Sequence, residues 1–503
     1  MTLLRKLLFW RKEDKKKKTE SFDSDMLEVD FFCQLAYMAA IATSGISRSG
    51  LFYHAARLPY SATRYFRRVD FVAKMFNHDY AQACRIVGEK TKEPAIKALL
   101  LRLSGALASG EDVSGFLSRE SGVLSELYGS SYERRLDLLR KWSDAYVSLI
   151  LSSALVTVMS VVTMMIGNVT VTFMASLAVL TIATTIFGSW FLFHTAPRES
   201  KNHSLPIRSL EQNFARNLSL LLFPIGGAIA VLVLVTQGNL GFAMLVAAAF
   251  MFPVGFVAMM DDWKVSKRDS DVAAFLRSLG GVMQAIGATA AEAISRLDFR
   301  SLGILKEDVT LLHTRLVAGV APDACWNRFV CETGSELVNR SVRTFYDGIT
   351  LGGEPQDVGV ESSTLATKIS LLRAQRAQIA AGFTWLTVAM HTVLTALSVF
   401  IYSVFLQFSH LVEKLLPKEG PETLVPNLPS FGLFTQGQMQ MNLLYMMVMT
   451  IVFVLTVANA FAIFSVSGGH PRKLVFYLAM TTGISGAVLV LVPSIAGMLF
   501  KVV

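Results

Sequence analysis

The sequence predicts an all-α membrane protein of about seven transmembrane helices with two duplicated helical-bundle domains. Of the 503 residues, 52% are hydrophobic and only 17% are charged, a balance typical of a polytopic membrane protein. Long blocks without Asp, Glu, Lys or Arg include Leu149–Phe193, Asn217–Met260 and Ala377–Val412. Two polar segments lie before and between them, Ser21–Ser148 and Asp261–Arg376, and their apolar residues recur at the three- and four-residue spacing of helices.

Span lengths follow from the roughly 20 apolar residues that a helix needs to cross a bilayer. The first two uncharged blocks are each long enough for two spans. The predicted order begins with a basic tail (1–20), domain 1 (21–148), spans 1 and 2 (149–193), a loop (194–216) and spans 3 and 4 (217–260). It continues with domain 2 (261–376), span 5 (377–408), an external loop (409–440) and spans 6 and 7 (441–500).

Orientation follows from the excess of Lys and Arg in cytoplasmic loops. With the N-terminus inside, 44 of the 47 basic residues fall on the cytoplasmic side, and only Lys414, Lys418 and Lys501 fall outside. We therefore expect a multi-pass protein of the cytoplasmic membrane with both polar domains in the cytoplasm and the C-terminus external. The cysteines all lie in these domains, where we expect reduced, buried thiols: Cys33, Cys84, Cys325 and Cys331.

The basic excess is concentrated at the N-terminus. Residues 1–20 hold eight Lys or Arg against three acids and supply +5 of the net charge of +9. Leu3, Leu4, Leu7 and Leu8 share one helical face, which favours a short helix on the membrane surface, although a disordered basic tail explains the segment equally well. This distribution fits a lipid bilayer and no nucleic acid, which would require a basic face with stacking aromatics.

Domain 1 predicts several short helices, with breaks near Ser44-Gly45, Leu58-Pro59, Asn77 and Ser109-Gly110. Domain 2 repeats its landmarks at an offset near 243 residues. The repeated pairs are Phe31-x3-Leu35 with Phe275-x3-Leu279, Ala83–Val87 with Trp326–Val330, and Ser109-Gly110-Glu111 with Gly352-Gly353-Glu354. We interpret the repeat as an internal duplication.

The sequence contains no motif typical of an active site, a cofactor-binding site or a metal site, so we predict no enzymatic activity, no cofactor and no metal. Gly88-Glu89-Lys90-Thr91 lacks the upstream glycine of a phosphate-binding loop. Gly483-Ile484-Ser485-Gly486 is similar to the serine motif of rhomboid-type intramembrane proteases, but His391 precedes Ser485, which is the wrong order. His391 is the only titratable group deep in a span. A proton or ligand site is one interpretation, and a neutral histidine bonded to a neighbouring helix is the one we favour.

The layout resembles the type II secretion system F family, the inner-membrane platform proteins of type II secretion, type IV pili, tight-adherence pili and the archaellum. The similar features are a small-residue turn, a helix behind a short loop and a Gly-Glu turn: Ser44–Ser47, Phe76–Val87 and Ser109–Val113, with second copies at Ala288–Ala290, Gly319–Val330 and Gly352–Glu354. Ala290 replaces the glycine expected in the second copy. Two domains fused with seven spans are most similar to the archaeal members.

The resemblance implies a platform that couples a cytoplasmic hexameric ATPase to the insertion of prepilin- or archaellin-like filament subunits, and it implies a homodimer. A membrane transporter or permease that uses a separate ATPase is the alternative. We expect basic residues near the helices that join domain to span to dock the ATPase, or else to bind anionic lipid. They are Arg134, Arg135, Arg140, Lys141, Arg373 and Arg376.

Overall fold

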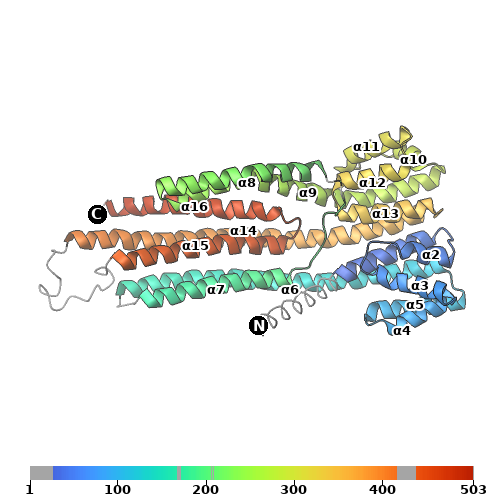
Figure 1. The fold of residues 1–503 in the computed structure, drawn as a ribbon, viewed down its shortest axis with the longest axis horizontal. Coiled ribbons are helices and arrows are strands. Elements are labelled where there is room, and N and C mark those ends of the chain that lie inside the picture. Colours follow the sequence, from blue (N-terminus) through green and yellow to red (C-terminus); the bar gives the residue numbers. More distant parts are fainter. Residues whose placement is uncertain (1–25, 167–170, 206, 208, 416–437, 502–503) are drawn as a thin grey trace, which may run out of the picture. The chain divides into compact units, whose positions relative to one another are not determined.

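The computed structural model describes residues 26–166, 171–205, 207, 209–415 and 438–501. The predicted tail over 1–20, the turn near Gly167-Asn168 and most of the loop over 409–440 lie outside this range. Within it the chain is helical, apart from turns and an isolated bridge between Asn202 and Ser335 (Figure 1). Seven described helices are long and apolar enough to cross a membrane, so the prediction of an all-α polytopic membrane protein is confirmed.

Two compact units make up the chain, and we call them the polar unit and the span unit. The polar unit contains Met1–Arg135, Pro197–Leu210 and Asp262–Gln375, and the span unit contains Leu136–Ala196, Glu211–Asp261 and Arg376–Val503. Most of both predicted domains therefore belongs to the polar unit, whereas residues 136–148 of predicted domain 1 belong to the span unit. Three unbroken helices contribute more than one residue to both units: α6 (Val113–Ile166), α9 (Leu240–Ile286) and α14 (Pro355–Leu415).

The first copy of the duplicated domain begins with a helix over residues 26–42 and continues through α2 (Arg48–Ala55), α3 (Thr63–Met75), α4 (Tyr80–Lys90) and α5 (Pro94–Ser109) to α6. Local chemistry sets these ends. Ser47 accepts from the Gly50 amide at 3.2 Å and Asp79 from the Ala81 amide at 3.3 Å, as N-caps do. Gly110 ends α5 in the left-handed region, with φ of 75°. All four predicted breaks fall between helices.

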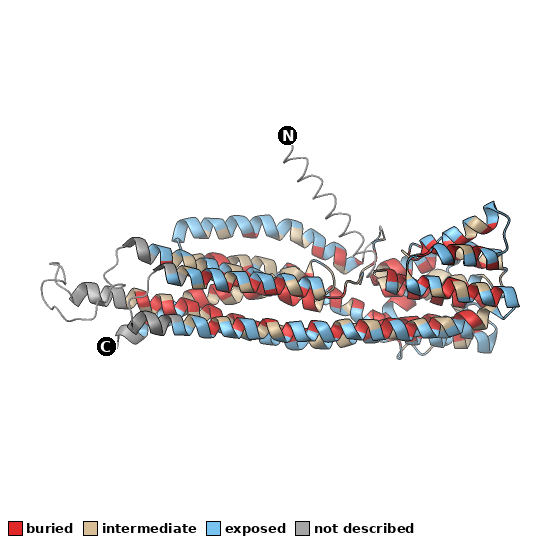
Figure 2. Ribbon diagram, turned by 90° about the horizontal axis from the view of Figure 1, so that it is seen from below, coloured by how far each residue is buried: buried red, intermediate tan, exposed pale blue. Residues whose placement is uncertain are grey.

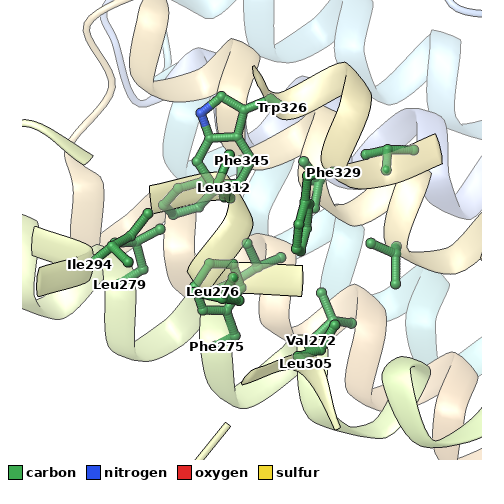
Figure 3. Close-up of a cluster of buried hydrophobic side chains, with 14 of the residues drawn as sticks. Val272, Phe275, Leu276, Leu279, Ile294, Leu305, Leu312, Trp326, Phe329 and Phe345 are labelled. Carbon is green, nitrogen blue, oxygen red and sulfur yellow. The ribbon is translucent and has the colours of Figure 1, made fainter. Parts of the chain in front are cut away.

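The second copy consists of the end of α9, α10 (Ala290–Arg296), α11 (Leu305–Val317), α12 (Pro322–Thr333), α13 (Glu336–Thr350) and the start of α14. Its core is apolar and fully buried (Figure 3). Phe275 of α9 lies with its ring centroid 6.1 Å from Phe329 and 6.5 Å from Trp326 of α12. Each such side chain contributes on the order of 2–3 kcal/mol through removal from water, so this core holds α9 against the four shorter helices.

The two copies share the same helix order and nearly the same spacing. The helix starts pair as Arg48 with Ala290, Thr63 with Leu305, Tyr80 with Pro322, Pro94 with Glu336, and Val113 with Pro355, and each pair is separated by 242 residues. Because the offset is the same for all five helices, the distance along the chain from one helix start to the next is the same in both copies. The structure thus agrees with the duplication inferred from the sequence.

Equivalent or nearly equivalent positions of the two copies also contact each other. On α6 and α14, Ser118 donates to Glu361 at 2.5 Å, across 243 residues. Two turns later Lys368 pairs with Glu126 at 3.1 Å, across 242 residues. The two contacts follow one another in the same direction along α6 and α14, so the two helices are parallel. Contacts between like positions also indicate an approximate twofold axis that runs along the helices, as in an isologous dimer interface.

The span unit adds α7 (Val171–Thr195), α8 (Leu210–Gln237), α15 (Gln438–Ser467) and α16 (Lys473–Lys501). Glycines allow α9 and α16 to approach closely, as is common between membrane helices. A Cβ on Gly255 would lie 2.4 Å from the Phe476 backbone, and one on Gly486 would lie 2.9 Å from the Leu245 amide. Figure 2 shows buried and exposed residues alternating along the helices, and on the spans many exposed residues are apolar because lipid can solvate them.

Candidate functional site

The six basic residues predicted to dock a partner divide into two groups. Arg134, Arg140 and Lys141 are exposed on α6, and the half-buried Arg135 pairs with Glu28 at 2.8 Å. Arg373 and Arg376 of α14 instead make their contacts inside the protein. Docking of a partner by the six residues stays a prediction: the structure shows four of them with exposed or half-buried side chains and two engaged within the protein.

Arg376 caps the end of another span helix. Its guanidinium is buried, with 7% of the residue exposed, and it donates to the carbonyls of Ser465 and Val466 at 3.1 and 3.0 Å. These carbonyls belong to the last turn of α15, where the helix leaves acceptors without partners and favours a positive charge. A Cβ on Gly468 would lie 2.7 Å from the guanidinium, so the glycine makes room for it. The sequence alone did not indicate this role.

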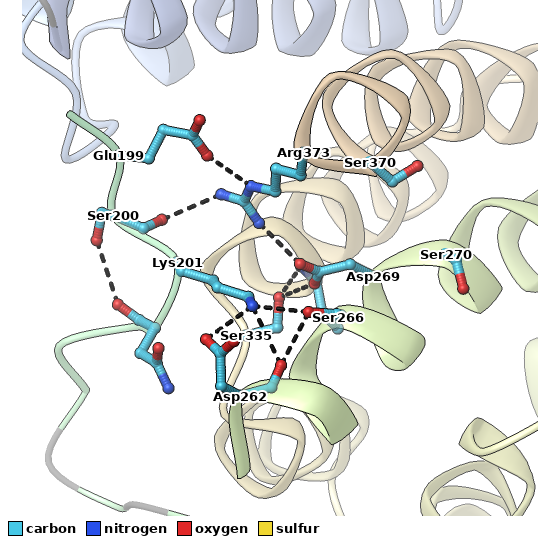
Figure 4. Close-up of polar contacts among 12 residues, drawn as sticks. Glu199, Ser200, Lys201, Asp262, Ser266, Asp269, Ser270, Ser335, Ser370 and Arg373 are labelled. Atoms are coloured by element: carbon cyan, nitrogen blue, oxygen red, sulfur yellow. Dashed lines mark hydrogen bonds and ion pairs between the residues drawn. The ribbon is translucent and has the colours of Figure 1, made fainter. Parts of the chain in front are cut away.

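Arg373 lies at the centre of a charged junction in the polar unit (Figure 4). Its Nε donates to Glu199 at 2.9 Å, one Nη to Asp269 at 2.7 Å, and the other Nη to the Ser200 carbonyl at 3.2 Å. Asp269, on α9, is 1% exposed and also accepts from the hydroxyl of Ser335, the N-cap of α13. The junction therefore joins α9, α13 and α14 to the segment between α7 and α8.

The same segment makes a second set of bonds with the second copy. Lys201 Nζ lies 2.7 Å from both Asp262 Oδ1 and Ser266 Oγ on α9. Its carbonyl accepts from the Glu336 amide at 2.9 Å, next to the bridge between Asn202 and Ser335. The sequence predicted only a short polar loop over 194–216. Glu199 and Glu211 are the acidic residues of that loop, and neither indicated the partners from sequence alone.

Arg340 of α13 makes a buried contact between the two copies. Its Nη1 lies 2.8 Å from Asp30 and 3.3 Å from the Cys33 sulfur, both on the helix over 26–42, and its guanidinium covers the Tyr60 ring at 4.8 Å. Arg340 and Asp30 are 8% and 4% exposed. Burial raises the pKa of the Cys33 thiol despite the nearby arginine. All four cysteines are buried and unpaired, as the sequence predicted.

A cleft of about 280 Å³ lies between the two copies. Tyr37 donates to Asp347 across it at 2.9 Å, and burial raises the pKa of the Asp347 carboxyl. Its rim carries charge of both signs. The lining residues include His54, Arg57, Asp323, Trp326, Arg343 and Asp347.

The span unit contains a buried hydrogen-bond network around His391, which is 0% exposed. Its Nε2 lies 3.0 Å from Ser485 Oγ and 3.3 Å from the Thr481 carbonyl on α16, and its Nδ1 lies 3.1 Å from Asn459 Nδ2 on α15. Asn459 Oδ1 accepts from the Tyr146 hydroxyl of α6 at 2.6 Å. The network joins α6, α14, α15 and α16, which agrees with the favoured interpretation of a histidine bonded to neighbouring helices.

Donor and acceptor roles in this network run in one direction. A carbonyl only accepts, so the contact with Thr481 assigns the proton to Nε2 of His391 and leaves Nδ1 to accept from Asn459. Ser485 then accepts from His391 and donates to Thr456, at 2.7 Å, which donates to the Val452 carbonyl at 2.7 Å. With the proton on Nε2, His391 donates to Ser485 and does not act as its base.

Replacing His391 with Leu is expected to destabilise the span unit by about 1–2 kcal/mol, since it leaves Asn459 and Ser485 without their partner in an apolar surrounding. Thermal unfolding in detergent measures the effect. Val393→Leu, on an exposed site of the same helix, is the control and should change little. Labelling of Ser485 by a serine-directed fluorophosphonate would contradict the assigned proton positions.

Metal chemistry has no evident site in the part of the chain that the structure describes, where no three His, Cys, Asp or Glu residues are grouped to hold an ion.

Comparison with known proteins gives two relatives, both archaeal. The chain is 26% identical over 314 residues to flagella accessory protein J of Methanocaldococcus jannaschii, covering 59% of this chain and 55% of that protein. It is 23% identical over 306 residues to flagella accessory protein J of Methanococcus voltae, covering 57% and 53%. The chain thus matches about half the length of each relative. No protein-family model and no solved structure matches it.

Proposed function

We propose that this protein is a membrane platform for assembly of an archaellum or a related type IV-like filament. The observation that carries the proposal is the duplicated helical domain, in which the last helix of each copy, α6 or α14, continues without a break into a span. The similarity to two proteins named flagella accessory protein J supports the same function. The sequence contains no phosphate-binding loop, so in this proposal a partner supplies the ATP hydrolysis.

Both copies of the domain lie in the cytoplasm under this proposal, with the N-terminus inside and the C-terminus outside. The charge distribution supports that orientation, since 44 of 47 basic residues then lie inside. A hexameric cytoplasmic ATPase binds the polar unit, and its conformational cycle moves the helices shared with the span unit. Filament subunits are inserted beside the spans.

Arg373 has a positioning role in this scheme. Its bonds to Glu199 and Asp269 tie the segment between α7 and α8 to α9 and α14. When a partner displaces the polar unit, the segments that connect it to several spans would then move together, and the motion would not be limited to the bending of one helix.

Arg140 and Lys141 fit the alternative of lipid binding better than ATPase docking. They follow the point in α6 where the span unit begins, at Leu136, and precede the half-exposed Trp142. Basic residues beside an exposed tryptophan at the start of a span are typical of the membrane–water interface. We assign them to anionic headgroups on the cytoplasmic leaflet.

Binding of the ATPase to the full chain in nanodiscs tests the function. We expect the purified hexameric assembly ATPase of the same organism to be retained and its hydrolysis rate to rise. The same chain in proteoliposomes should produce no solute flux. Substrate-dependent flux without ATPase retention would favour the transporter alternative and refute the platform.

A further inference from the structure

Helix α3 presents an exposed face that the packing of its own domain does not use. Tyr65, Phe66 and Val69 point into the core, as Thr63 and Ala73 also do. The opposite side exposes Phe71 and Met75, by 56% and 66%, and Phe76 follows the helix with 64% exposed. Adjacent apolar side chains of this size on a water-soluble surface mark an interaction site.

The second copy retains exposed apolar residues at the equivalent element. Val317 of α11, which is 242 residues after Met75, is 67% exposed, and Leu311 is 47% exposed. The charges differ, however. Helix α3 carries Arg64, Arg67, Arg68 and Lys74 against Asp70, whereas α11 carries two basic and two acidic residues. Only the first copy combines the apolar side chains with an excess of positive charge.

This cationic face continues toward the cleft between the copies. The Tyr53 ring lies between Arg57, at 3.8 Å, and Lys74, at 5.2 Å, and Arg57 lines the cleft. A partner on α3 would therefore find an adjoining hollow for an anchoring side chain, the arrangement found at the centre of protein interfaces.

We propose that the exposed face of α3, with Arg64, Arg68, Phe71 and Met75 at its centre, docks an acidic, partly apolar surface of a soluble protein, namely the ATPase of the proposed function on which this inference rests. Charge complementarity selects an acidic partner. The composition of this face favours a protein partner, because Arg, Met and aromatic residues are enriched in protein interfaces. A face that bound anionic lipid could use Lys equally well.

The test uses the full chain in nanodiscs of zwitterionic lipid and the purified ATPase. Arg64→Glu/Arg68→Glu should weaken binding by about tenfold or more and reduce its salt dependence, because two cations at the docking face become anions. Phe71→Ser/Met75→Ser should weaken binding similarly without changing the salt dependence. For the charged pair, the matched control in the second copy lies 242 residues later, Lys306→Glu/Thr310→Glu. For the apolar pair, the control is Leu311→Ser/Val317→Ser, at two exposed apolar sites of α11. They should bind within about twofold of the unchanged chain.

Three outcomes overturn the inference and each has a different meaning. If the unchanged chain does not bind the ATPase, the proposed function itself fails. If the unchanged chain binds and the α3 variants bind equally well, only the docking site fails, and loss of binding in Arg140→Glu/Lys141→Glu alone would move the site to α6. A parallel set of nanodiscs contains anionic lipid. If the α3 variants weaken binding in that set and not in the zwitterionic nanodiscs, the face binds lipid instead.

Discussion

Arg340→Met is expected to lower the free energy of unfolding of the polar unit by about 3–5 kcal/mol, because it leaves a buried carboxylate without its counter-ion. Asp30 is 4% exposed and loses its 2.8 Å contact with the guanidinium. Glu336 loses a 2.9 Å contact as well. Thermal unfolding in detergent should show a fall of about 6 °C or more, at roughly 2–4 °C per kcal/mol.

A double variant separates the ion pair from the packing of the long side chain. Arg340→Met/Asp30→Asn removes both charges while an amide oxygen can still accept from the Ser61 amide, which bonds Asp30 at 2.8 Å. It should recover most of the lost stability. Arg343→Met, exposed on the same helix, is the control and should change little. If the single and double variants were equally destabilised, the contact between the copies would depend on packing and not on charge.

Arg373→Met is expected to have a comparable effect of about 3–5 kcal/mol, for the same reason, since Asp269 is 1% exposed and would be left charged in the interior. The variant also releases Glu199 and the Ser200 carbonyl. The segment between α7 and α8 should then be cut faster by trypsin after Arg198 or Lys201. Thermal unfolding and limited proteolysis measure the two consequences separately.

Lys368→Met is a matched control on α14. Lys368 pairs with Glu126, whose side chain is 78% exposed, so this ion pair is worth only about 0.2–1 kcal/mol. Adding Asp269→Asn to Arg373→Met should restore stability, because Asn still accepts a hydrogen bond from Ser335. It should not restore the contact that fixes Glu199. Unchanged trypsin sensitivity in Arg373→Met would show that the bonds of Lys201 hold the segment alone.

Many of the hydrogen bonds and ion pairs inside the protein join side chains that are distant in sequence. Arg373 and Arg140 are both basic residues near a helix that joins domain to span, and their local patterns do not distinguish them. One points to Glu199 and Asp269 within its unit, and the other is exposed. Likewise, the chain order of His391 and Ser485 argued only against a rhomboid-type protease, and it did not indicate that α14 and α16 place the two side chains 3.0 Å apart.

The sequence by itself determined the seven spans, the breaks between the short helices and the duplication. Those properties depend on local hydropathy, on capping and turn residues such as Asp79 and Gly110, and on a constant spacing along the chain. Only the tertiary structure decided which charges are internal, which histidine nitrogen carries the proton and which face of α3 stays exposed. A buried charge or hydrogen bond is defined by its partner, and partners 104 residues apart, such as Arg373 and Asp269, leave no local pattern.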